Sequence, residues 1–372
     1  MSALQIKWLH CCLLLLLFFY VPAYTQISIS GRVVDAITDV PVANASIYFN
    51  NTTIATKTNQ QGAFTFTGLN YITSELVISG SGYELLVFKP TAAQLKAQGK
   101  FVFKLQGKEP APQNTIPLDG AIKKRWLEIF YSTVLGISAE AAKCSILNDT
   151  SIYFLSAPGS NIFFAYADKP LVIDNAMLGY KISFDLIEFS YNDATAQSDF
   201  VGYCRYEETG DAKKYGKNRK RCYYGSSLHF YRSLLAHQLP QQGFGTFLLK
   251  VDTAKGNTKT AVPVQEDDLD AFVPVTAQQL LYIDSNNNFS IRFNGKLLVQ
   301  YYHDPYGKAY LSQNVFVQGA LNKGVESYLT INSSPVYINN TGALSDASAI
   351  SYTGYWLYER LANILPYDYQ PE

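Results

Sequence analysis

Two short segments decide the fold of the N-terminal part, SISGRVVDA at residues 28–36 and GAFTFTGL at residues 62–69. In the second segment Phe64 and Phe66 face the same side, because successive side chains of a strand point to opposite faces. Gly62 precedes them and turns the chain. Similar alternating segments run on to residue 105: ASIYFNN, TTIATKTN, SELVISGSGY, ELLVFKP and KFVFKL. Short alternating strands separated by turns predict a β-sandwich.

The first 25 residues have the composition of a secretory signal peptide. Lys7 supplies a positive charge, and Leu13 to Val21 form an unbroken apolar run. Small residues at Ala23 and Thr25 then precede a cleavage point before Gln26. The apolar run is about half as long as the roughly 20 residues that a transmembrane helix needs. We therefore expect export to the periplasm, to the periphery of the outer membrane or to the medium, and no transmembrane span.

The sandwich is predicted to span residues 26–107 and to be followed by a different kind of region. Residues 108–118 contain three prolines and no apolar periodicity, which indicates a linker. Residues 119–372 mix helical and strand patterns, with a sub-boundary expected near residue 244. This region is predicted to have an α+β fold with antiparallel sheet and a few helices.

Helix signals stand at two places in this region. Apolar residues at helical spacing follow Asp119, a suitable N-cap, and end at Gly136. A second helix is expected to begin at Ser226 or Ser227 and to continue toward Gly243. The strand patterns include residues 280–302, read as three strands, and residues 326–344, read as a further hairpin.

The N-terminal part resembles the carboxypeptidase-regulatory-like domain, a transthyretin-like β-sandwich of the immunoglobulin type. The residues that carry the resemblance are Gly31, Val33, Asp35, Pro41, Val42, Ala45, Ile47, Thr58, Asn59, Gly62, Phe64, Phe66 and the turn Gly82-Tyr83-Glu84. The resemblance implies a mainly β protein. It implies no activity, because a fold does not fix a function.

The whole mature chain also resembles a family of exported Bacteroidetes proteins in which this domain precedes a family-specific region of unknown function. The residues in common are Ile146-Leu147-Asn148, Leu178-Gly179-Tyr180-Lys181-Ile182, Asn218-Arg219, Tyr223, Gly225-Ser226, His229-Phe230, Arg232-Ser233-Leu234, Gly243-Phe244, Gly354-Tyr355-Trp356 and Leu365-Pro366. This resemblance implies an architecture only.

Composition and motifs exclude several classes of activity. The thirty basic and thirty acidic residues balance, so the protein has no net positive charge that would attract nucleic acid. A zinc carboxypeptidase needs a histidine and a glutamate three positions apart, yet Arg232 stands three positions after His229. Asp284 and Asn288 begin like a calcium loop, but Phe289 replaces its glycine, so a polar turn is expected. No metal, cofactor or catalytic residue is predicted.

The segment KKYGKNRKRCYYGSSLHFYRS at residues 213–233 is the candidate site. Six cations lie within nine positions, and a helix start with free N–H groups follows at Ser226. The candidate anion-binding residues are Asn218, Arg219, Arg221, Tyr223, Gly225, Ser226, His229 and Arg232. The alternative is a solvated basic loop that pairs with the acidic residues 266–270.

Three cysteines remain after the signal peptide, namely Cys144, Cys204 and Cys222. An odd number permits at most one internal bridge. Cys204 and Cys222 are the expected pair because they flank the basic segment, which is expected to form a hairpin or loop. The alternative is three buried thiols.

Two classes of function remain open. The first is a non-catalytic envelope protein, binding or structural, whose partner is an envelope glycan, a lipid headgroup or another envelope protein. The second is a hydrolase or transferase with a site built on Tyr223, Ser226, His229 and Arg232. An enzyme is expected to gather these side chains in a concave pocket beside a carboxylate.

Overall fold

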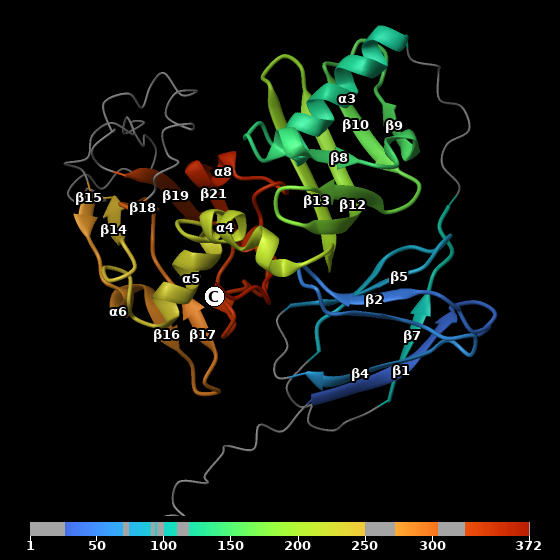
Figure 1. Ribbon diagram of the computed structural model, residues 1–372, viewed down its shortest axis with the longest axis horizontal. Helices are drawn as coiled ribbons and strands as arrows, with labels where there is room; N and C mark the ends of the chain where they lie inside the picture. Colours follow the sequence, from blue (N-terminus) through green and yellow to red (C-terminus); the bar gives the residue numbers. More distant parts are fainter. Residues whose placement is uncertain are drawn as a thin grey trace, which may run out of the picture.

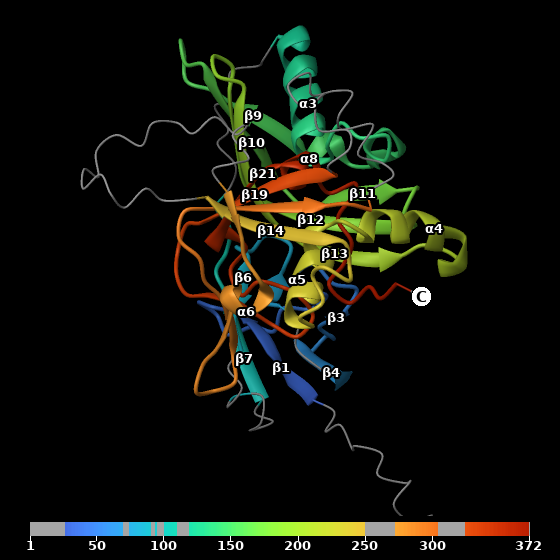
Figure 2. The ribbon, with the colours of Figure 1, turned by 90° about the vertical axis from the view of Figure 1, so that its left-hand side faces the viewer.

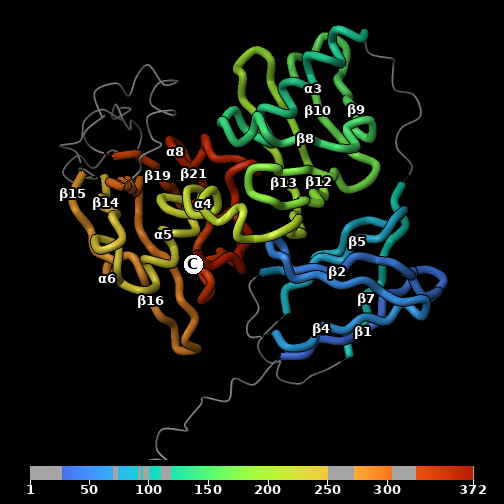
Figure 3. The backbone as a smooth tube through the Cα atoms, in the orientation of Figure 1, coloured from blue at the N-terminus to red at the C-terminus, as the bar shows by residue number. Residues whose placement is uncertain are grey.

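The computed structural model describes residues 27–69, 74–90, 94, 100–109, 119–249, 272–303 and 324–371. The predicted signal peptide (1–25), most of the predicted linker (110–118) and the acidic residues 266–270 lie outside the described residues. The described chain forms three modules, the N-terminal sandwich (27–107), the central module (120–223) and the C-terminal module (227–358). Figures 1 and 3 show the three modules side by side.

The N-terminal sandwich has two sheets, with strand orders β4-β1-β7 and β3-β2-β5-β6. β1 pairs antiparallel with β4 and parallel with β7. Val33, Ile47 and Phe64 fill the space between the sheets. The strands are β1 (Ile27–Asp35), β2 (Ser46–Phe49), β3 (Ala55–Lys57), β4 (Ala63–Leu69), β5 (Leu76–Ser79), β6 (Leu86–Phe88) and β7 (Lys100–Leu105). The predicted β-sandwich is confirmed.

Gly62 is required at the turn before β4. Its φ of 69° is one that side chains other than glycine rarely adopt, and an added β-carbon would lie 2.4 Å from the carbonyl oxygen of Val33. The glycine therefore allows the close approach of this turn to β1.

The central module packs helix α3 (Gly120–Val134) on a six-stranded antiparallel sheet of order β8-β11-β12-β10-β9, with β13 beside β12. Trp126 of α3 stacks on Phe163 with ring centres 4.4 Å apart. Asp119 caps α3, as predicted, by accepting the Ala121 N–H. The other elements are β8 (Cys144–Ile146), β9 (Ile152–Leu155), β10 (Ile162–Ala167), β11 (Leu171–Asn175), β12 (Tyr180–Asn192), β13 (Gln197–Glu208) and α4 (Ala212–Tyr223).

The C-terminal module has a five-stranded sheet, β15-β14-β18-β19-β21, and a three-stranded sheet, β16-β17-β20. Its elements are α5 (Ser227–Leu235), β14 (Phe244–Leu249), β15 (Phe272–Pro274), α6 (Ala277–Leu280), β16 (Leu281–Ile283), β17 (Phe289–Ile291), β18 (Lys296–Tyr301), β19 (Val325–Ile331), β20 (Val336–Ile338), β21 (Ile350–Gly354) and α8 (Tyr355–Tyr358). The module is mainly antiparallel β with short helices, as predicted.

One predicted hairpin is wrong. β19 pairs with β18 and β21, whereas β20 pairs with β17 in the other sheet. The physical reason is burial: Val336 and Ile338 reach the core by lying against β17.

The predicted sub-boundary near residue 244 falls inside one core, because Phe244 packs in the same cluster as Phe230. Leu228, two positions before Phe230 in α5, belongs to the central core instead.

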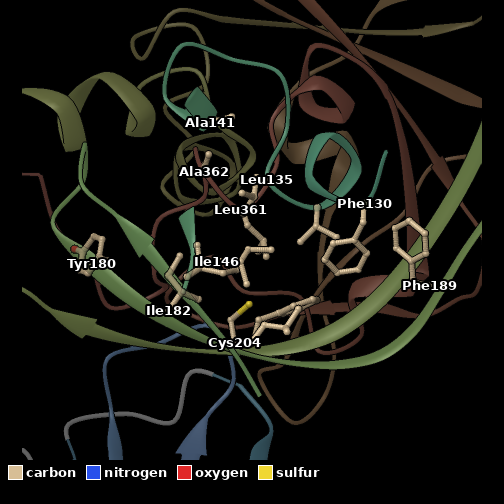
Figure 4. Packing of buried hydrophobic residues seen from close by; sticks show 14 of the residues in the cluster. Phe130, Leu135, Ala141, Ile146, Tyr180, Ile182, Phe189, Cys204, Leu361 and Ala362 are labelled. Atoms are coloured by element: carbon tan, nitrogen blue, oxygen red, sulfur yellow. The ribbon is translucent and has the colours of Figure 1, made fainter. Parts of the chain in front are cut away.

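The C-terminal residues 359–371, which we call the tail, lie between all three modules (Figures 1 and 2). Leu361 and Ala362 pack into the central core beside Leu135 (Figure 4). The Ala362 carbonyl accepts a hydrogen bond from Asn175 of β11 (3.0 Å). The Tyr367 N–H donates to the carbonyl of Asn51 in the sandwich (2.7 Å). The tail thus joins modules that are distant in the sequence.

Candidate functional site

The basic segment forms a helix, α4, and not the predicted hairpin or loop. The side chain of Asp211 caps the helix by accepting the Lys213 N–H (3.0 Å). Arg219, Cys222 and Tyr223 are buried on one face. Because residues three and four positions apart share a helix face, the spacing that buries these side chains turns most of the lysines outward.

Arg219, a predicted anion ligand, lies inside the molecule with an exposed fraction of 4%. It forms an ion pair with Glu208 (2.7 Å) and donates from Nε to the Leu178 carbonyl (2.8 Å). Nη2 donates to the Gly179 carbonyl (3.3 Å), and the guanidinium lies 4.0 Å from the ring centre of Tyr180. These contacts fix α4 against the start of β12, so the guanidinium is used structurally.

Asn218 and Arg221 are also bonded to the protein. The Asn218 amide donates to the Met177 carbonyl (3.0 Å), and Arg221 forms an ion pair with Glu140. Both contacts tie α4 to the rest of the central module.

The structure brings Tyr223, Gly225, Ser226 and His229 together where α4 ends and α5 begins. Ser226 is the N-cap of α5, as predicted: its hydroxyl accepts the His229 N–H (3.2 Å) and donates to the Tyr223 carbonyl (2.7 Å). Gly225 has a φ of 89°, and an added β-carbon would lie 2.7 Å from the ring of Tyr301. The cluster is therefore a packed junction between two helices.

His229 is almost fully buried in this junction, with an exposed fraction of 3%. Its Nδ1 accepts the Gly225 N–H (3.1 Å), so Nε2 carries the hydrogen and donates to Gln242 Oε1 (3.2 Å). The rings of Tyr223 and Phe244 lie on either side. Burial lowers the pKa of His229 to about 4, so the imidazole is neutral at pH 7.

Arg232 holds the tail in place. Its Nε donates to the Thr341 carbonyl (2.8 Å), Nη1 to the Tyr369 carbonyl (2.8 Å) and Nη2 to the Tyr367 carbonyl (2.9 Å). A planar guanidinium suits this role because its donors are fixed in a fork. Arg232 thus connects α5, the loop after β20 and the tail.

These contacts do not form the catalytic site considered as an alternative. A serine hydroxyl acts as a nucleophile when it is hydrogen-bonded to a side-chain base. Both hydrogen bonds of the Ser226 hydroxyl go to backbone groups, and the two nitrogens of His229 contact Gly225 and Gln242. Tyr223, Ser226, His229 and Arg232 are neighbours, but they pack a helix junction.

The predicted disulfide between Cys204 and Cys222 is wrong, because both cysteines are free, as is Cys144. Cys204 lies on β13 in the central core, and the strands of the sandwich lie below this sheet in the view of Figure 4. Cys222 lies on α4 with its sulfur 3.9 Å from the Asn363 amide. Folding of the basic segment as a helix separates the two thiols, and each is buried as a small apolar group.

Three lysines of α4 line a hollow of about 590 Å³, which we call the lysine hollow. Lys213, Lys217 and Lys220 border it, and the carboxylates of Glu208 and Asp368 lie in its wall. The lysine spacing of four and three positions was a usable sequence signal. The contribution of Asp368 from the tail had no such signal.

Other polar groups singled out in the sequence have local roles. The Asp284 carboxylate accepts the N–H groups of Asn286 (2.8 Å) and Asn288 (2.9 Å), which makes the predicted polar turn. Within the described ranges, no group of three or more His, Cys, Asp or Glu could hold a metal ion. No helix in the described part of the chain is long and apolar enough to span a bilayer.

The fold of the N-terminal sandwich agrees with a comparison of the sequence with known protein families. Residues 29–109 match the family model of the CarboxypepD_reg-like domain. The CarboxypepD_reg-like domain thus coincides with β1 to β7 and confirms the resemblance drawn from the sequence for this part of the chain. No curated protein matches the chain. The kinship with exported Bacteroidetes proteins stays a prediction.

Proposed function

We propose that this protein is an exported, non-catalytic envelope protein that binds an anionic group in the lysine hollow. The observation that carries the proposal is that Lys213, Lys217 and Lys220 border one hollow and form no ion pair within the described residues. Clustered ammonium groups repel one another unless an anion lies between them. An arrangement of this kind favours a ligand over a structural role.

The charges around the hollow leave a positive excess. Arg219 and Glu208 neutralise each other as an ion pair. Asp368 offsets one lysine and is itself held by the hydroxyl and N–H of Thr53. The remaining charge suits a phosphate, sulfate or carboxylate group of a glycan or a lipid headgroup.

The lysine hollow lies where three parts of the chain meet, which suits a binding site. Thr53 comes from the CarboxypepD_reg-like domain, α4 from the central module and Asp368 from the tail. A hollow built by three parts of the chain is fixed only when all three are docked. Binding of an anion is therefore expected to stabilise the assembled protein.

The test is a triple substitution, Lys213→Gln, Lys217→Gln and Lys220→Gln. We expect binding to heparin, a sulfated glycan, or to phosphatidylglycerol vesicles to weaken about tenfold or more and to lose its salt dependence. Because exposed charges contribute little to stability, the melting temperature should change by less than about 2 °C. The probe that binds, heparin, vesicles or inorganic phosphate, identifies the source of the anion.

A matched control removes three exposed lysines elsewhere, with Lys100→Gln, Lys123→Gln and Lys169→Gln. The control has the same net charge as the test variant, so a general charge effect would weaken both equally. Equal weakening in the two variants, or no binding of any of the three probes by the native protein, would overturn the proposal.

Export is the second part of the proposal and rests on residues 1–25. Expression in a Gram-negative host with intact-mass analysis of the periplasmic fraction should give a chain that starts at Gln26. An uncleaved chain in the cytoplasm would contradict export without affecting the lysine hollow.

A further inference from the structure

A second cleft, of about 630 Å³, lies between the sandwich and the C-terminal module. We call it the junction cleft. Glu75 and Lys89 border it from the sandwich, and Phe289, Tyr337 and Asn340 border it from the C-terminal module. Ligand sites occur preferentially at such junctions and have volumes in this range. From its lining we infer that the junction cleft binds a neutral saccharide.

The charge of the cleft excludes an ionic ligand. Glu75 and Lys89 are the two charged residues of its wall, and their side chains lie 3.6 Å apart. Lys89 also donates to the Ser345 carbonyl (3.2 Å) on the opposite wall. The carboxylate and the ammonium neutralise each other, so the wall of the cleft presents no net charge to a ligand. This distinguishes it from the lysine hollow.

The polar groups of the cleft match hydroxyl groups. Asn340 is exposed, and its side chain makes no hydrogen bond within the described residues. A carboxamide both donates and accepts, as a sugar hydroxyl does. The turn is rigid, because Asn339 Oδ1 accepts the N–H groups of Thr341 (2.9 Å) and Ala343 (3.1 Å). A rigid wall lowers the entropic cost of binding.

The aromatic groups supply the apolar part of the match. Tyr337 on β20 has an exposed fraction of 37%, and Phe289 lies on the adjoining strand β17, where it pairs with Ile338. A pyranose ring has a face of C–H groups and a rim of hydroxyls. The face can lie on an aromatic ring while the rim bonds the amides. A lipid chain would leave those amides unpaired in the cleft, which is costly.

The experiment is calorimetric titration of the full chain with neutral tetrasaccharides of glucose, xylose, mannose and N-acetylglucosamine. We expect at least one to bind with a dissociation constant of about 1 mM or lower. Tyr337→Ala and Asn340→Ala should each weaken that binding about tenfold. Asn340 is exposed, so Asn340→Ala should keep the native melting temperature. Tyr337 is 37% exposed, so Tyr337→Ala should lower it, and binding is measured well below the melting temperature of each variant.

Two controls make the result specific to this cleft. Tyr166→Ala removes a tyrosine of similar exposure (38%) on β10 of the central module and should leave saccharide binding unchanged. The triple lysine variant should also bind the saccharide normally. The proposals for the lysine hollow and for the junction cleft are therefore tested independently. The inference is overturned if no tetrasaccharide binds at about 10 mM, if binding survives both cleft substitutions, or if a peptide or an anionic glycan occupies the cleft instead.

Discussion

The hydroxyl of Tyr48 donates a hydrogen bond of 2.6 Å to the carboxylate of Asp185. Tyr48 lies on β2 of the sandwich and Asp185 on β12 of the central sheet, so this bond crosses the interface between two modules. Ser79 donates to the second carboxylate oxygen (2.9 Å). Burial raises the pKa of Asp185, while these two hydroxyls act against the rise. The interface therefore contains a carboxylate whose charge depends on donors from the other module.

Tyr48→Phe should destabilise the docked protein by about 1–3 kcal/mol at pH 7, because the ionised carboxylate loses a donor. The bond favours the ionised form, so its contribution is present above the folded pKa of Asp185 and shrinks as the pH falls through that value. Urea unfolding at pH 7 and pH 4 measures the difference. Tyr282→Phe removes an exposed hydroxyl on β16 and should change little. An equal cost of Tyr48→Phe at both pH values would contradict this account.

Arg232→Ala should cost about 2–4 kcal/mol, because three carbonyl groups lose a charged donor at once. Arg232→Lys should recover less than half of that loss, since a single ammonium cannot replace a fork of donors. Arg292→Ala is the control, because Arg292 is exposed and lies over the ring of Tyr282. Thermal unfolding of the native protein and of the three variants measures these differences in stability. Full rescue by lysine would mean that charge alone matters at this position.

His229 should make the protein sensitive to acid. Its pKa is about 4 in the folded state and 6.5 in the reference state. The unfolded chain therefore takes up a proton first, and stability present above pH 6.5 is lost as the pH falls toward 4, by up to roughly 3 kcal/mol. His229→Gln should flatten this dependence in unfolding experiments between pH 7 and 4.5. His237→Asn, at an exposed histidine with positive φ, should leave it unchanged.

The mature chain should contain three free thiols. Burial raises the pKa of Cys144 and of Cys222 to about 12 and also raises that of Cys204. A thiol reagent at pH 8 should react slowly with the folded protein, because the thiolate is the reactive form. Denaturation without a reductant should then release three equivalents. A single equivalent would indicate a bridge between two of the cysteines.

Features determined by neighbouring residues were predicted correctly. Asp119 and Ser226 cap their helices because a cap needs only a side-chain oxygen and an N–H two or three positions later. The strands of the sandwich were predicted from the alternation of apolar and polar residues, which depends only on the residues within each strand. Features that depend on distant partners were missed. Arg219 was interpreted as a ligand for an anion, yet its acceptors are Glu208 and two carbonyls some forty positions earlier.

By itself the sequence determined the sandwich, the positions of the caps and the basic character of residues 213–221, because each depends on contacts within a few residues. The tertiary structure alone decided which cations face inward, which strands share a sheet and where hollows open. Arg232 shows the reason. Its three acceptors lie more than a hundred positions later in the chain, so only the folded tail explains why a charged side chain of α5 is partly buried.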